Sequence, residues 1–264
     1  LDIRLNTIDW LKDFKDPEDI ESIHRWNWMI YEISKKNNQI SLEELIFYQR
    51  SWYNQFINEI DNQNCKKYLR WSSYSIAERI SNSILVFNYF NEEIPFDILN
   101  CLNQQVYYLT RNLEYFDVYT GNHIINNARA LYLYSIHTRD NNIQNLAKTI
   151  FYDQLNRMIT KDGFLREGSS HYHFLFLRWL VEVFYFSVQF GDNSFSKYLK
   201  THIFNLAKNS LHFLYKNKDE VFSISLFGDI SPDFPPEWLA SLICSDIMPF
   251  NIELLPKSKL PVYS

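Results

Sequence analysis

The sequence is poor in glycine and cysteine, and each shortage excludes some kinds of fold or site. Only 5 of the 264 residues are glycine, and all lie at or after Gly121. A β-rich protein needs many positive-φ turns, which glycine supplies, so the shortage favours helices. The three cysteines, Cys65, Cys101 and Cys244, are too few and too scattered for a disulfide framework or a zinc site.

The chain also lacks a basic excess and a long apolar run. Its net charge of −5 makes nucleic acid a poor candidate partner, so an anionic ligand would have to meet a local cluster of donors. The most apolar stretch, Phe174 to Phe184, contains Arg178 and Glu182, so no membrane span is predicted. Aromatic residues are abundant, at 17%, and they either fill helix interfaces or stack on sugars.

Apolar residues recur at helical spacing along most of the chain. Ile76, Ile80 and Ile84 follow one another every four residues, and Ser41 with Glu44 has the spacing of a capping box. We predict helices near residues 18–37, 41–60, 73–90, 96–115, 122–138, 143–160, 172–190, 195–216 and 235–246, and a short strand within 221–227. Short connections predict that neighbouring helices pack antiparallel as hairpins.

We predict one domain over residues 1–249, in which the hairpins form a solenoid or close into a toroid. No fixed-period repeat is visible, which weakens the solenoid. Residues 250–264 hold two prolines and no helical period, so they are interpreted as a tail or the start of a further domain.

The first of three polar segments follows Gly121. Asn122 is placed to cap the next helix, and Asn122, Asn126 and Arg129 share one face of that helix at i, i+4, i+7 spacing. Taken alone, the segment is explained by a capping asparagine and a solvated polar stripe.

The second segment is Asp162–His173. Two glycines and a serine cap lead into an apolar helix, so Tyr172 and His173 are expected in its first turn. The positive end of the helix would stabilise a phenolate or a substrate carboxylate there. A helix-start tyrosine with a hydrogen-bonded hydroxyl is the plainer alternative, but the density of ionisable groups around Glu167 favours a site.

The third segment is Phe227–Leu239. Asp229 and Asp233 could bind a cation or cap turns, and turn chemistry is favoured because no complete calcium-loop pattern is present. Pro235–Pro236 is placed to open the last helix.

These residues resemble the heparinase II/III and alginate-lyase superfamily of polysaccharide lyases. Asn122–Leu131 is similar to its Asn-His-Leu-x-x-Asn-x-x-Ala-Leu helix start, and Asp162–His173 to its Asp-Gly-x-x-x-Glu-x-Ser-x-x-Tyr-His stretch. Trp71–Asn82 resembles its Trp-x-Pro-Tyr-x-x-x-x-Arg-x-x-Asn segment, with Ser73 in place of the proline. Ser170-His171 also departs from a frequent Pro-Met. The resemblance extends over residues 10–240.

The resemblance implies an all-α fold, an incomplete (α/α) toroid of antiparallel helical hairpins. The family's C-terminal β-sandwich, which often supplies another catalytic His or Tyr, is expected to be absent from this chain. The chain could therefore be inactive alone even if the full-length protein is a lyase. The resemblance favours a periplasmic or secreted protein, a cytoplasmic one stays open, and the oligomeric state is left open.

A lyase of this kind removes the C5 proton of a uronic acid and expels the C4 oxygen. Hydrogen-bond donors must neutralise the carboxylate beside C5, because negative charge develops there in the transition state. The resemblance implies Asn122 and His123 as the catalytic donors and Tyr172 as acid and base, with His173 either sharing the base role or orienting Tyr172. The scheme needs no metal and no cofactor.

Further residues are candidates for binding the acidic polysaccharide. The guanidinium of Arg79 matches a carboxylate fork, and Glu167 is better suited to holding a His or Arg than to direct chemistry. The substrate-binding candidates are Arg79, Tyr74, Trp71, Asn126 and Glu167.

Three alternatives to a lyase stay open. A non-catalytic toroid could bind polysaccharide during surface polysaccharide assembly. A glycoside hydrolase would need two carboxylates, for which Glu167 and Asp229 could be nominated. In a plain helical scaffold, Asn122, Arg79 and Tyr172 would face unrelated surfaces.

Overall fold

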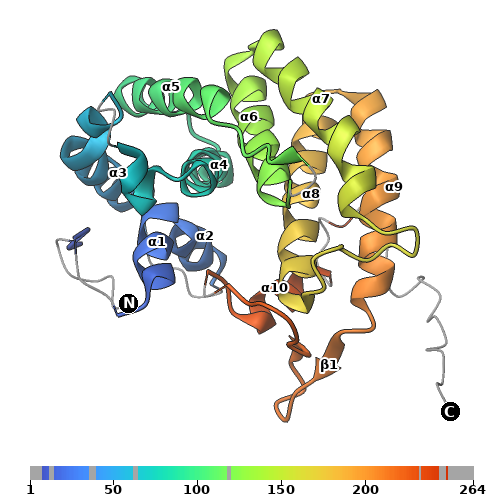
Figure 1. The fold of residues 1–264 in the computed structure, drawn as a ribbon. Coiled ribbons are helices and arrows are strands. Elements are labelled where there is room, and N and C mark those ends of the chain that lie inside the picture. The colour runs from blue at the N-terminus through green and yellow to red at the C-terminus, as the bar shows by residue number, and fades with distance from the viewer. Residues whose placement is uncertain are drawn as a thin grey trace, which may run out of the picture. The chain divides into compact units, whose positions relative to one another are not determined.

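The computed structural model describes residues 8–11, 15–35, 40–61, 65–117, 120–231, 233–243 and 248. The chain divides into two compact units, Leu1–Tyr115 and Phe116–Ser264 (Figure 1). Cys244 and the predicted tail, residues 250–264, lie outside the described residues. The single domain predicted over residues 1–249 stays a prediction.

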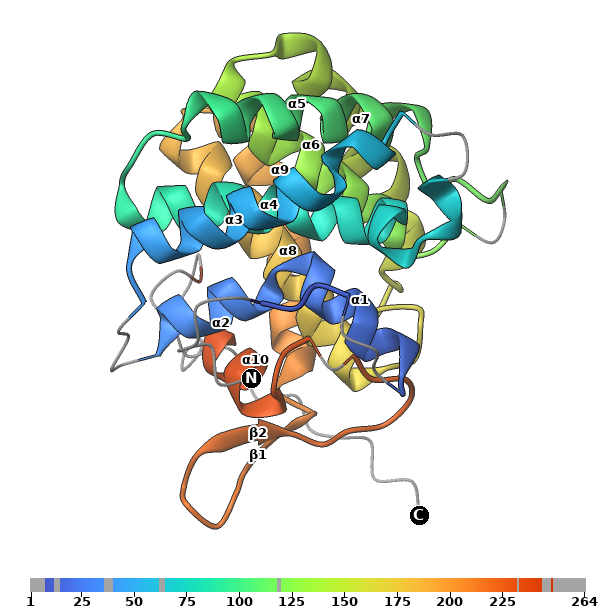
Figure 2. The same cartoon turned by 90° about the vertical axis from the view of Figure 1, so that its left-hand side faces the viewer.

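The first unit is built from helices alone among its described residues. Its elements are α1 (Pro17–Arg25), α2 (Asn27–Ser34), α3 (Leu42–Phe56), α4 (Ser73–Phe90) and α5 (Phe96–Arg111), with the 3-10 turns η1 (Ile57–Glu59), η2 (Cys65–Lys67) and η3 (Leu69–Trp71). Helices α3, α4 and α5 pack against one another (Figure 2). The capping box predicted at the start of α3 is confirmed. The Ser41 hydroxyl accepts from the Glu44 backbone N–H at 3.2 Å, and the Glu44 carboxylate accepts from the Ser41 N–H at 2.8 Å.

The single helix predicted near 18–37 is wrong, because Trp26 interrupts it. Trp26 has left-handed backbone angles (φ 63°, ψ 19°) and separates α1 from α2. Its indole is fully buried and meets the rings of Trp52 and Tyr53 edge to face, with centroids 5.8 and 5.4 Å away. A left-handed residue costs about 1–2 kcal/mol, which the burial of an indole and two aromatic contacts can offset.

Arg79 on α4 lies at the centre of the first unit with its guanidinium fully buried. Its Nε donates to Gln105 Oε1 at 2.7 Å, and its two terminal nitrogens donate to the carbonyls of His24 at 2.9 Å and Arg70 at 3.1 Å. The guanidinium carbon also lies 4.0 Å from the ring centroid of Trp52. One side chain therefore joins α1, η3, α3 and α5 to α4.

The second unit consists of helical hairpins and one small sheet. Its elements are α6 (His123–Thr138), α7 (Asn141–Met158), α8 (Ser170–Gln189), α9 (Asn193–Ser210), β1 (Leu214–Lys216), β2 (Phe222–Ile224) and α10 (Pro236–Ile243). Helix α6 packs on α7 and α8 on α9 as antiparallel pairs, and β2 lies beside α10 (Figures 1 and 2). The strands pair antiparallel, with Leu214 opposite Ile224.

The predicted helix near 195–216 is wrong in its last turn, because it ends at Ser210 and residues 214–216 form β1. The carbonyl of Phe213 accepts from the Ser225 N–H at 2.8 Å. The backbone groups that would prolong the helix thus bond across the hairpin. The strand predicted within 221–227 corresponds to β2.

Among the described residues, helices account for all regular structure except this hairpin of two three-residue strands. The predicted all-α class with antiparallel helical hairpins is therefore confirmed. None of the helices in this part of the chain is both long and apolar enough to span a membrane.

Replacing Arg79 with alanine is expected to lower the free energy of unfolding by about 3–5 kcal/mol, since three buried acceptors lose their donor and a cavity opens beside Trp52. The matched control is Arg50→Ala. Arg50 is an exposed arginine paired with Asp97 at 2.7 Å, and its loss should cost at most about 1 kcal/mol. Urea unfolding of both variants measures the difference, and equal losses would contradict a central role for Arg79.

Candidate functional site

The first two polar segments meet at the beginning of α6. The Asn122 side chain donates from Nδ2 to Glu167 Oε2 at 2.5 Å, and its backbone N–H donates to Glu167 Oε1 at 3.0 Å. A carboxylate 45 residues away in the sequence is therefore held at two points by one residue. Gly121 directly precedes Asn122, and a Cβ added there would lie 3.4 Å from Glu167 Oε1, at ordinary van der Waals distance.

Asn122 occupies the N-cap position of α6, but its side chain makes no capping hydrogen bond. An N-cap asparagine usually stabilises a helix by about 1 kcal/mol through its side chain. Here the amide is directed to Glu167 instead. The predicted capping position is thus confirmed, whereas the predicted capping bond is replaced by a contact between two motif segments.

The Glu167 carboxyl lies among opposing electrostatic influences. The residue as a whole is exposed, yet the partial burial of its carboxyl group raises its pKa, and the negative charge of Asp229 adds to the increase. The Asn122 N–H and the charge of His123 act in the opposite direction. Asn122, His123, Glu167 and Asp229 thus share one electrostatic neighbourhood in the second unit.

Tyr172 lies in the first turn of α8, as predicted. Ser169 caps that helix, and its hydroxyl accepts from the Tyr172 N–H at 3.0 Å. The Tyr172 side chain is half-buried, and its ring meets that of His171 edge to face at 6.2 Å. Glu167, which Asn122 contacts, precedes the cap residue Ser169 by two residues, so the segment that Asn122 binds leads directly into the turn that carries Tyr172.

His173 is buried, and both of its ring nitrogens are bonded to backbone groups. Nδ1 accepts from the Leu165 N–H at 3.2 Å, so Nε2 carries the proton and donates to the Leu206 carbonyl at 3.0 Å. Burial lowers its pKa to about 4. Of the two roles considered from sequence, this arrangement favours the orienting role for His173 over that of a base.

His171 was not singled out from the sequence, yet its ring is held in the same way. Nδ1 accepts from the Ser231 N–H at 3.4 Å, and Nε2 lies 3.1 Å from the Phe234 carbonyl. The third polar segment therefore packs on the start of α8. A histidine next to a site tyrosine is the only sequence signal for this contact, and it does not identify the partner segment.

The remaining predicted binding residues are buried and contact other protein groups. Trp71 Nε1 donates to Glu59 at 2.8 Å, the Arg25 guanidinium lies 4.7 Å from the Tyr74 ring centroid, and Asn126 Oδ1 accepts from Arg129 at 2.8 Å. Like Arg79, the side chains of Trp71 and Tyr74 help to build the first unit. We do not include Trp71, Tyr74 or Asn126 in the proposed site.

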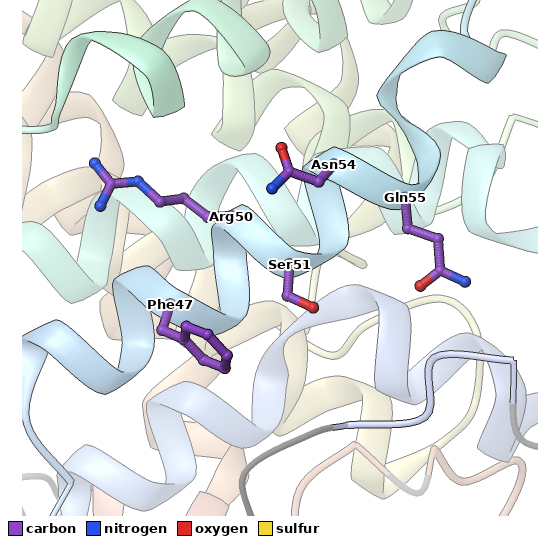
Figure 3. Close-up of a pocket in the computed structure, with 5 residues that line it drawn as sticks. All are labelled: Phe47, Arg50, Ser51, Asn54 and Gln55. Atoms are coloured by element: carbon purple, nitrogen blue, oxygen red, sulfur yellow. The ribbon is translucent and has the colours of Figure 1, made fainter.

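Two hollows on the surface of the first unit lie away from these residues. One, of about 570 Å³, follows the outer face of α3, where Phe47, Arg50, Ser51, Asn54 and Gln55 line it (Figure 3). A smaller one of about 320 Å³ lies between the end of η1 and α5. None of the predicted site residues lines either hollow.

Metal ligands do not gather in the part of the chain that the structure describes. No group of three His, Cys, Asp or Glu side chains there is placed to hold a metal ion.

The buried His173 predicts a pH-dependent stability. Its pKa is lower in the folded chain than the usual value of about 6.5, so the unfolded chain binds more protons between about pH 4 and 6.5. The contribution of His173 to the free energy of unfolding is therefore fully present above pH 6.5. It is lost as the pH falls toward 4, by up to about 3 kcal/mol.

Urea unfolding at several pH values measures this loss, with His173→Gln as the comparison, since glutamine keeps a donor for Leu206 but does not titrate. The variant should show a flatter pH dependence than the wild type. An identical slope in both proteins would contradict the assignment.

Comparisons with known proteins agree with the family indicated by the motifs. Residues 4–242 match the family model described as Heparinase II/III N-terminus. A comparison with curated proteins found no significant match.

Two solved structures share the fold. Heparinase III is 19% identical with a TM-score of 0.58, covering 80% of this chain and 34% of that chain. The heparan sulfate lyase HepC from Pedobacter heparinus is 16% identical with a TM-score of 0.55, covering 84% of this chain and 36% of that chain. This chain thus spans about a third of the length of either structure. Because the family model matches residues 4–242, which is most of the chain and includes both segments that meet at Glu167, the chain belongs to the heparinase II/III N-terminal family.

Proposed function

We propose that this chain supplies the helical part of a polysaccharide lyase site that cleaves a uronic-acid-containing polysaccharide by β-elimination. The contact between Asn122 and Glu167, two residues before the cap that positions Tyr172, is the observation that supports it most. This contact supports the proposal because it ties the Asn122 amide to the segment that leads into the helix carrying Tyr172.

Asn122 is the proposed donor to the substrate carboxylate. Asn122 is buried, one N–H of its amide bonds to Glu167 and fixes the orientation of the group, and our scheme assigns the other N–H to the uronate. An amide stays neutral at every working pH, so it can offset the charge that develops beside C5 without itself titrating. His123, exposed at the first position of α6, is the proposed second donor.

Tyr172 is the proposed acid and base. Its place in the first turn of α8 puts the phenol near the positive end of a 20-residue helix, which stabilises a phenolate. As phenolate it would take the C5 proton, and as phenol it would protonate the departing C4 oxygen. In this scheme His173 and His171 hold the turn that carries Tyr172.

Heparan sulfate is the first glycan to test, because one structure with this fold is a heparan sulfate lyase. Alginate is the second, since it too contains uronic acids. The protein should be assayed in its natural length, as this chain corresponds to about a third of each similar structure.

Replacing Tyr172 with phenylalanine should lower kcat by a factor of at least about 10². The affinity for oligosaccharides should stay within about threefold of the wild type. The assay follows the ultraviolet absorbance of the 4,5-unsaturated uronate product. Tyr185→Phe, on the exposed side of the same helix, is the matched control and should retain wild-type turnover.

Turnover that survives in Tyr172→Phe would contradict the assignment of the acid and base. New reducing ends without unsaturated product would indicate a hydrolase instead. Binding without any cleavage would favour the non-catalytic alternative.

Glu167→Gln tests the orientation of Asn122. A glutamine offers one oxygen where the carboxylate offers two, so we expect kcat/KM to fall about tenfold. Because partial burial and Asp229 raise the pKa of Glu167, protonation should weaken wild-type activity at a higher pH than an ordinary carboxyl would. The acid side of the pH–kcat/KM profile should flatten in the variant, and an unchanged profile would contradict the role of Glu167.

A further inference from the structure

The loop that follows β2 exposes apolar side chains beside the start of α8. Leu226, Phe227 and Ile230 are 47%, 48% and 52% exposed. Scattered exposed apolar residues are common, but three within five residues of a loop next to a polar site are a local concentration.

Phe227 is fixed to the start of α8 through both of its backbone groups. Its N–H donates to the Ser170 hydroxyl at 3.1 Å, and its carbonyl accepts from the Ser170 N–H at 3.1 Å. Two residues on, the Asp229 carbonyl accepts from the Ser169 hydroxyl at 2.5 Å. Ser169 caps α8 and Ser170 is its first residue, so Phe227 is anchored within a helical turn of Tyr172.

Gly228 brings the loop into direct contact with the Glu167 segment. It has a positive φ of 74°, and a Cβ there would lie 2.6 Å from the Gly168 carbonyl oxygen and 2.9 Å from the Ser169 Cα. Only glycine permits this approach. The contact also explains why the charge of Asp229 acts on Glu167.

The Phe227 ring has one supporting aromatic neighbour and is about half exposed. The Phe213 ring meets it edge to face, with centroids 5.1 Å apart. A half-exposed ring with fixed backbone and a supporting neighbour loses little conformational entropy when a ligand covers it. Flat aromatic faces contact the apolar C–H faces of sugars by dispersion and through their quadrupole.

From this geometry we infer that Phe227 is a stacking platform for a sugar ring of the polysaccharide next to the ring on which Tyr172 acts. The Gly228–Asp229 turn and Ser170 hold the platform in place. The inference takes the chemical class of its ligand from the proposed function, and it adds a substrate-binding residue from the third polar segment.

Affinity for heparan sulfate and alginate tetrasaccharides, measured by calorimetry on the natural-length protein in the Tyr172→Phe background, tests the platform. Phe227→Ala should weaken binding about three- to tenfold, as expected for one lost aromatic contact. Phe227→Tyr, which keeps the flat face, should stay within about twofold of the parent. Phe222→Ala, a 38% exposed phenylalanine on β2, is the matched control and should leave binding unchanged.

Phe227→Leu separates stacking from packing, because leucine can still fill the space against Phe213 but has no aromatic face. It should weaken binding as alanine does while keeping the wild-type unfolding temperature. Unchanged affinity in Phe227→Leu and Phe227→Ala would overturn the platform, and so would a loss in Phe227→Tyr or in Phe222→Ala as large as that in Phe227→Ala. Failure of the parent protein to bind either tetrasaccharide would also contradict it.

The unsaturated-product assay on the wild type distinguishes this outcome from failure of the proposed function. Binding that depends on Phe227, without unsaturated product, would leave the platform standing and exclude the lyase. Unsaturated product together with binding that does not depend on Phe227 would exclude the platform and support the lyase.

Discussion

The two-point hold of Asn122 on the Glu167 carboxylate is the contact on which the rest of the candidate site depends. Hydrogen bonds to a charged group contribute about 1.5–3 kcal/mol each, whereas the capping bond that Asn122 forgoes is worth about 1 kcal/mol. The exchange is favourable, and it ties the start of α6 to the loop before α8. The Asn122 amide, which does not cap α6, has a fixed orientation beside the carboxylate. A donor that is oriented before substrate arrives needs no reorganisation during the reaction.

The start of α8 is also held by hydrogen bonds, from groups that take no part in the proposed chemistry. His173 spans the backbones of Leu165 and Leu206, and His171 meets the backbones of Ser231 and Phe234. Burial lowers the pKa of both imidazoles, which keeps them neutral and able to accept from an N–H. The turn that carries Tyr172 is therefore fastened by hydrogen bonds to segments on both sides of it in the sequence.

Periodicity and capping chemistry predicted most of the helices, because both are local properties of the chain. Ser41 was recognisable as a cap without knowledge of the tertiary structure, and so was a serine cap at Ser169 or Ser170, of which the structure has Ser169. The break at Trp26 was not, since nothing local distinguishes a tryptophan that continues a helix from one drawn into a cluster with Trp52 and Tyr53. Tertiary packing overrode local preference there.

The candidate site divides in the same way. Motif spacing predicted that Asn122, Glu167 and Tyr172 carry polar chemistry, and the structure brings the first two into contact. Motif spacing could not distinguish an arginine that binds backbone carbonyls from one that binds a substrate, because the residue type and the spacing are the same in the two cases. Arg79 is of the first kind in the described residues. Phe227 was missed because its signal, an aromatic before one of five glycines, acquires meaning only through the contact of Gly228 with Gly168.

A crystal structure of the natural-length Tyr172→Phe protein with a heparan sulfate tetrasaccharide would test the central claim most directly. We expect a uronate carboxylate within hydrogen-bond distance of Asn122 Nδ2, with Glu167 still bonded to the same amide and residue 172 facing C5 of that sugar. A saccharide bound elsewhere, or one whose carboxylate is met by other donors while Asn122 stays covered, would contradict it.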